Sequence, residues 1–250
     1  MLRDQRKTKE FFDHWIRFDE TQMRKTEARL DSGAIDRTEG RVIAAYHQFD
    51  GVLRRVIMRY SRGDALADLR GDVALLLSMS EQVLKYCDAL PPEQQSVRTI
   101  YEQLSFDSYI DWFWWLSLAV CLDMGREHVL RVLELIGNAG QDTLLDRIAV
   151  RLGEERTVGA NLKFPKQYGT LLQALAAPSR EQQTNFARTF LDGWYDGCSH
   201  AAWHENHSGE DTGYIGYWCF ELALVVKLFD IDDASFRDNP YYPADLVRGP

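Results

Sequence analysis

The sequence lacks the long hydrophobic run that a membrane-spanning helix requires. Its most apolar stretch, from Trp112 to Leu122, has only 11 residues, whereas a helix that crosses a bilayer needs about 20. No apolar segment follows the basic residues of the N-terminus, so the sequence predicts no secretory signal peptide. We therefore expect a cytoplasmic protein that has no membrane partner.

Cysteine is scarce and widely spaced. The four cysteines form no C-x-x-C pair, and they stand at Cys87, Cys121, Cys198 and Cys219. This spacing is not that of a disulfide framework or of a zinc ribbon. We expect four reduced thiols that are mostly buried.

Sequence motifs of common enzymes are also missing. There is no G-x-S-x-G nucleophile elbow. Gly213 and Gly216 are not followed by the residues that complete a phosphate-binding loop. The sequence therefore predicts no catalytic residue, no cofactor and no enzyme.

Three histidines are the best alternative to this prediction. His200, His204 and His207 are spaced i, i+4 and i+7, which on a helix would place them on one face and would suit a divalent metal in a hydrolase. The segment misses the H-E-x-x-H pattern, because position 208 is serine. Asp230, Asp232 and Asp233 similarly lack the spacing of a calcium loop. We expect solvated or hydrogen-bonded histidines and no metal.

Period-two alternation, the mark of a half-buried strand, is absent beyond short ambiguous runs. Helical periodicity dominates instead. The pattern predicts an all-α fold, a compact array of about nine or ten helices with a non-helical C-terminal tail. The expected helices cover residues 4–31, 36–60, a segment from the N-cap Asp64 to Pro91, and residues 93–104, 126–137, 141–152, 165–177, 180–193, 194–205 and 213–229, with the aromatic segment 106–124 between the fourth and the fifth. Gly125 is the expected boundary between an N-terminal half, 1–125, and a C-terminal half, 126–250, packed as one unit.

Charge is unevenly distributed along the chain, whose net charge is −9. Residues 1–60 carry 13 Lys and Arg against 10 Asp and Glu, whereas residues 204–250 carry 3 against 9. The basic residues of the first segment are interleaved with acids from Asp4 to Glu27, which predicts a salt-bridged, solvated helix face rather than a nucleic-acid site. An acidic chain of this kind is suited to a basic protein partner.

Four consecutive aromatic residues, Trp112 to Trp115, lie in one predicted helix. Successive helical positions differ by about 100°, so the four rings cannot all face one core. A helix buried on several sides accounts for them. An interface between the two halves or in a homodimer is the alternative.

The last 45 residues combine a polar loop, an aromatic segment with two glycines, one apolar helix and an acidic tail. Gly213–Glu221 reads GYIGYWCFE, and Asp232–Val247 reads DDASFRDNPYYPADLV. Glu221 is the one acid in its apolar run and needs a partner if it is buried, for which we expect a basic side chain from the N-terminal half. Two prolines restrict the residues before them, so the tail should be extended and packed back by its tyrosines.

These two motifs resemble those of the PoNi family of bacterial immunity proteins. The resemblance implies that the chain binds and neutralises a cognate PoNe-type DNase toxin, often an effector of type VI secretion, by masking its DNA-binding or active site. An adaptor or chaperone that binds the effector without inhibiting it is the alternative. The residues expected to keep the family fold are Gly213, Tyr214, Gly216, Tyr217, Trp218, Glu221, Asp232, Asp233, Tyr241, Tyr242, Pro243 and Asp245.

The toxin-binding residues are expected in the polar loop before this motif. Glu205, Asn206, Glu210 and Asp211 bring three acids and an amide close together in sequence, and loops commonly carry recognition.

Overall fold

The structure is a computed structural model that describes residues 1–209 and 213–248. All regular elements of these residues are helices, as the sequence predicts. The chain divides into two compact units. Unit 1 comprises residues 1–104 and 205–216, and unit 2 comprises residues 105–204 and 217–250.

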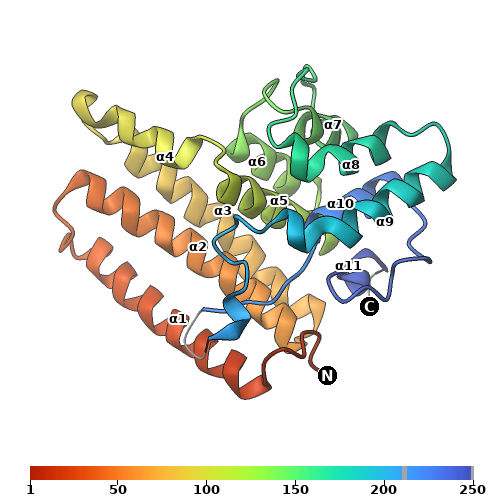
Figure 1. Ribbon diagram of the computed structural model, residues 1–250. Coiled ribbons are helices and arrows are strands. Elements are labelled where there is room, and N and C mark those ends of the chain that lie inside the picture. The colour runs from red at the N-terminus through yellow and green to blue at the C-terminus, as the bar shows by residue number, and fades with distance from the viewer. Residues whose placement is uncertain (210–212, 249–250) are drawn as a thin grey trace. The chain divides into compact units, whose positions relative to one another are not determined.

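Unit 1 is built on three long helices, α1 (Lys9–Asp31), α2 (Thr38–Arg62) and α3 (Leu66–Asp88). They run side by side in Figure 1, and α2 packs against both of the others. One face of α2 is buried, with Val52 and Val56 fully buried. Because α2 has neighbours on two sides, it is the central helix of the unit.

The ends of these helices follow from local chemistry. Thr8 caps α1 by accepting a hydrogen bond from the Phe11 amide. Gly63 ends α2 in the left-handed conformation, with φ of 94°. Asp64 does not cap α3 as predicted, because Ala65 stands at that position and the Asp64 carboxylate binds Arg59 and Arg62 instead.

The segment after α3 is less regular than predicted. In place of one helix at 93–104 there is a 3₁₀ helix, η1 (Pro92–Arg98), and a single α turn, α4 (Thr99–Glu102). Tyr101 packs on Tyr46 with ring centroids 5.1 Å apart. The segment therefore covers a small apolar cluster at the adjoining ends of α2 and α3.

Unit 2 contains α5 (Phe106–Cys121), α6 (Arg126–Ile136), α7 (Thr143–Arg151), α8 (Pro165–Ala176), α9 (Arg180–Gly197), α10 (Phe220–Phe229) and α11 (Ala244–Arg248). The core is the pair α5 and α10, and α10 also contacts α7, α8 and α9. Every residue from Phe220 to Val226 is buried. Phe113, Trp114 and Trp115 are buried too, so burial on several sides accounts for these rings.

Two further helix predictions need correction. The helices expected at 180–193 and 194–205 are one helix, α9, which ends at Gly197. The helix expected at 213–229 begins only at Phe220. No helix of the described residues is both long enough and apolar enough to cross a membrane.

Candidate functional site

Two residues of the predicted recognition loop, Glu205 and Asn206, lie in unit 1. Glu205 is exposed and has a φ of 59°, and Asn206 begins the short 3₁₀ helix η2 (Asn206–Ser208). Glu210 and Asp211 lie outside the described residues. The structure thus places Glu205 and Asn206 in one turn, with the Glu205 carboxylate facing solvent.

Buried contacts fix the loop to unit 1. Lys7 Nζ donates a hydrogen bond of 2.9 Å to the Gly209 carbonyl. The Tyr214 hydroxyl donates to the Asp4 carboxylate, and both side chains are buried. The Ser61 hydroxyl donates to the Ile215 carbonyl at 2.6 Å. These hydrogen bonds therefore hold the exposed turn in place on unit 1. Asp4 is buried, whereas the sequence predicts a solvated acid.

Gly213 and Gly216 determine the backbone conformation of the motif. Their φ angles are 63° and 111°, a region that residues with a Cβ rarely adopt. The backbone from Gly213 to Cys219 is consequently non-helical, which is why α10 starts later than its apolar pattern suggests. Between these glycines Tyr214 enters the core of unit 1 against Phe11 and Phe12.

The motif then continues in unit 2. Tyr217 and Trp218 are both buried. The Tyr217 ring lies 5.0 Å from that of Tyr195 and 5.6 Å from that of Trp203. The Cys219 amide donates to the Tyr241 carbonyl at 2.8 Å, so this part of the motif holds the middle of the C-terminal tail.

Glu221 is the central polar group of unit 2, and it is fully buried. Its carboxylate accepts hydrogen bonds from the Tyr168 hydroxyl at 3.0 Å, the Trp114 indole at 3.3 Å and the Trp194 indole at 3.5 Å. The basic partner expected from the N-terminal half is thus replaced by three neutral donors. Burial raises the pKa of Glu221 to about 7 because desolvation disfavours the charged form.

The tail folds by turns rather than as an extended strand. Asp233 is buried and binds Arg237, Arg248 and the Tyr242 hydroxyl. Asp232 is exposed, and its carboxylate accepts from the Ala234 amide at 3.0 Å.

The two tyrosines of the tail pack against different aromatic residues. Tyr241 stacks on Tyr195 at 5.1 Å, and Tyr242 packs against Phe236 at 5.2 Å. Pro243 is buried and Asp245 half-buried. The tail is non-helical through Pro243, as predicted, and the short helix α11 follows it.

The three histidines do not form the predicted row. His200 and His204 follow the end of α9, and His207 belongs to η2 in the other unit. His204 packs on Tyr195 with ring centroids 4.3 Å apart. Within residues 1–209 and 213–248, no three His, Cys, Asp or Glu side chains are grouped so that they could hold a metal ion. The spacing therefore does not correspond to a metal site in this part of the chain.

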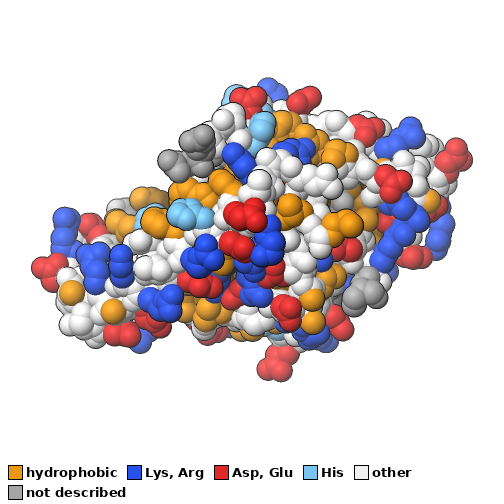
Figure 2. Space-filling view, turned by 90° about the horizontal axis from the view of Figure 1, so that it is seen from below, with side chains coloured by type: hydrophobic (Ala, Val, Ile, Leu, Met, Phe, Trp, Pro, Cys, Tyr) orange, Lys and Arg blue, Asp and Glu red, His pale blue; other side chains and the backbone are white. Residues whose placement is uncertain are grey.

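Charged side chains of both signs are interspersed on the face of the molecule drawn in Figure 2, with hydrophobic side chains between them. The net charge of −9 is therefore not gathered there into one acidic region. On such a surface, a basic partner would be recognised by a few neighbouring carboxylates. The exposed Glu205 is a candidate for one of these carboxylates.

Comparisons with known proteins cover almost the whole chain. The family model described as PoNe immunity protein (PoNi), N-terminal, matches residues 3–134, and the model described as PoNe immunity proteins (PoNi), C-terminal, matches residues 140–246. A search of curated proteins gave no match.

Solved structures support the fold. Three solved chains are similar. One is protein PA2201 from Pseudomonas aeruginosa, with a TM-score of 0.63 and 19% identity over 94% of this chain and 87% of that one. At this identity the likeness concerns the fold alone.

Proposed function

The chain belongs to the PoNi family of PoNe immunity proteins, and we propose that it neutralises one cognate DNase toxin by covering its DNA-binding or active site. Membership of an immunity family makes it a binding protein for a toxin rather than an enzyme. The observation that carries the proposal is the match of both family models, which together span residues 3–134 and 140–246.

Electrostatics supports a nuclease as the target. A DNase must attract the phosphates of DNA, and it does so with Lys and Arg. A partner with a net charge of −9 is attracted to the same surface and is steered to it at a high rate. We place this encounter in the cytoplasm of the producing cell, where its DNA is exposed to the toxin, and we assign the toxin to type VI secretion.

The polar loop is the proposed contact. Glu205 and Asn206 are anchored at the surface of unit 1, and Glu210 and Asp211 complete the group in sequence. Most of the family motif, in contrast, is buried, including Tyr214, Tyr217 and Glu221. We therefore assign the motif to the fold and the loop to recognition.

Co-expression with the toxin encoded beside this gene tests the function. We expect survival of the cells, intact DNA and a complex that co-purifies. Binding without survival would instead favour the adaptor. If the protein neither binds the toxin nor allows survival, immunity against this toxin is refuted. Size-exclusion chromatography of the free protein decides whether it is a homodimer.

A charge-reversal pair tests the loop. E210K/D211K should slow association with the toxin, and the loss should shrink as salt is raised. The matched control is D192K/D196K, which makes the same charge change on exposed positions of α9. Unchanged association by the loop variant would place the contact elsewhere.

A further inference from the structure

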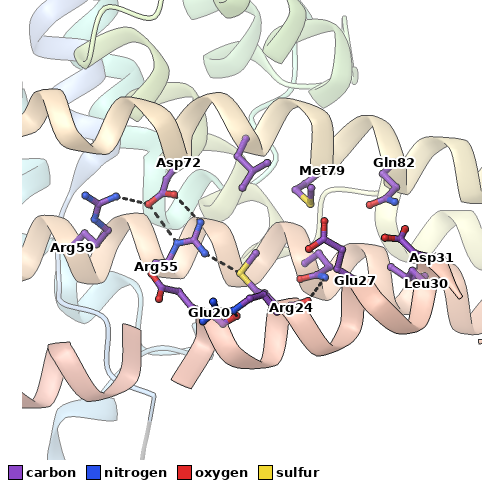
Figure 3. Close-up of a pocket in the computed structure, with 13 residues that line it drawn as sticks. Glu20, Arg24, Glu27, Leu30, Asp31, Arg55, Arg59, Asp72, Met79 and Gln82 are labelled. Carbon is purple, nitrogen blue, oxygen red and sulfur yellow. Dashed lines mark hydrogen bonds and ion pairs between the residues drawn. The ribbon is translucent and has the colours of Figure 1, made fainter. Parts of the chain in front are cut away.

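A groove of about 500 Å³ runs along unit 1 between α1 and α3, with α2 as its floor. Figure 3 shows the three helices crossing the view nearly side by side, with side chains of all three directed into the space between them. The groove exists because α2 packs against both neighbours. The outer helices therefore become two walls.

The groove has the length of a short helix. The wall residues of α1 extend from Glu20 to Asp31, and those of α3 extend from Asp72 to Gln82. At 1.5 Å per residue, the first of these stretches is about 16 Å long, or three helical turns. Three turns of a partner helix could therefore lie along the groove.

Positive charge at one end of the floor is already compensated. Arg55 and Arg59 each approach the Asp72 carboxylate at 2.7 Å, and Arg59 also pairs with Asp64 at 2.9 Å. The Arg55 guanidinium further lies 3.2 Å from the Met23 sulfur. Because the charges of these two guanidinium groups are neutralised by carboxylates of the same unit, they repel a basic ligand only weakly.

The carboxylates on the α1 wall are different. Glu20, Glu27 and Asp31 line the groove, and none of them has an ion-pair partner among residues 1–209 and 213–248. The ion pairs recorded for α1 involve Asp13. The salt-bridged face predicted from the sequence is therefore confined to the start of the helix, and three acids remain available toward its end.

Two of these acids, Glu27 and Asp31, lie where a carboxylate is unfavourable for the helix. Asp31 is the last residue of α1 and Glu27 precedes it by one turn. The C-terminal end of a helix carries partial negative charge, so a carboxylate there is destabilising. Arg24 is the one cation on this wall, and its Nε donates to the Glu20 carbonyl at 3.3 Å. Acids kept where they destabilise a helix, without partners, are typical of a binding surface.

Apolar side chains complete the surface. Met23 and the largely buried Leu30 from α1, and Leu75 and Met79 from α3, line the groove. Methionine is flexible and adapts to the shape of a ligand. A ligand that fits this surface must combine apolar side chains with positive charge.

We propose that this groove receives an amphipathic helix of the toxin, whose bound face carries Lys or Arg beside apolar residues. The partner assignment rests on the proposed function, because a DNase needs a basic surface for DNA. Docking of one helix face into a groove between helices is an established mode of recognition. The groove and the exposed turn at Glu205 belong to the same unit, so unit 1 offers two contact surfaces.

The double variant E27K/D31K tests the groove in the full-length protein. It should fold at least as well as the wild type, because lysine at these positions favours the helix dipole. We expect its Kd for the purified toxin to rise about 100-fold at 0.15 M salt, because like charges would face each other across the contact. The control D192K/D196K makes the same charge change in the last two turns of α9, and its Kd should stay within about threefold of the wild type.

Two outcomes separate this inference from the proposed function. If the wild type binds the toxin and E27K/D31K binds equally well, the groove assignment is wrong while immunity stands. If the wild type binds no toxin, the proposed function fails, and the partner assigned to the groove fails with it. Hydrogen exchange of the wild-type complex is independent of any variant, and it should show protection of residues 20–31 and 72–82. A complex that leaves both segments unprotected would overturn the groove.

Discussion

The buried carboxylate of Glu221 should make the stability of unit 2 depend on pH. The pKa of this group is raised from 4.5 to about 7 by burial. The folded state therefore prefers the protonated form. Stability from this group is complete below pH 4.5 and is lost as the pH rises through 7. Between pH 5 and pH 8 the free energy of unfolding should fall by about 2.5 kcal/mol on account of Glu221 alone.

The substitution E221Q isolates this contribution. Glutamine is neutral at every pH, so the variant should lose the 2.5 kcal/mol dependence whatever constant cost its amide adds. The comparison is therefore a difference between two pH profiles. Other titrating groups, such as Asp19, whose pKa is raised by burial to about 6, occur in both proteins and cancel.

Urea unfolding followed by tryptophan fluorescence is the appropriate assay. Six of the seven tryptophans belong to unit 2, and the indoles of Trp114 and Trp194 bind Glu221 directly. The control E155Q changes an exposed glutamate of the same unit and should follow the wild-type profile. Parallel profiles for the wild type and E221Q would refute the reasoning, because they would mean that Glu221 keeps its charge when buried.

Four further predictions concern a buried hydrogen bond, two glycines and the burial of the thiols. Y214F removes one donor of the buried Asp4 carboxylate, which also accepts from Arg6, and should lower the free energy of unfolding by about 1–3 kcal/mol, measured by urea unfolding. G159A should destabilise by about 1–3 kcal/mol, because a Cβ there would lie 2.4 Å from the Gly140 carbonyl oxygen. G193A in α9, with open space around it, should instead stabilise by about 0.5–1 kcal/mol; equal melting temperatures for the two alanine variants would contradict both. The four cysteines are buried, so a thiol reagent at pH 8 should label them only after denaturant is added, and rapid labelling of the native protein would refute their burial.

Helix positions were predictable from sequence wherever an apolar stripe and a clear stop coincide. Helices α1, α2 and α3 end close to the residues that the pattern indicates, because Gly33, Gly63 and the two prolines after Leu90 interrupt it. Where two elements share one apolar run, the pattern fails. The residues from Gly213 onward read as one helix with α10, and only the positive φ of Gly216 shows where the backbone turns.

The candidate site was less predictable, since its features depend on distant partners. Burial of Glu221 follows from its apolar neighbours, but its three donors come from α5, α8 and α9. No spacing in the sequence indicates that they meet. The groove on unit 1 was missed for a related reason. Alternating charges at Glu20, Arg24 and Glu27 suggest ion pairs along one helix, and only the position of α3 gives them another role.

The path of the chain between the two units has a consequence for how relatives can exchange specificity. The chain passes from one unit to the other after residues 104, 204 and 216. A single recombination between residues 134 and 140, where the two family models meet, would transfer α5 and α6 away from the α10 against which α5 packs. Transfer of the whole of unit 1 would need simultaneous crossovers at all three of these positions. Homologous chimeras with one crossover should therefore misfold. On our proposal that unit 1 contacts the toxin, new toxin preferences should arise more readily from point substitutions on unit 1 than from swapping modules.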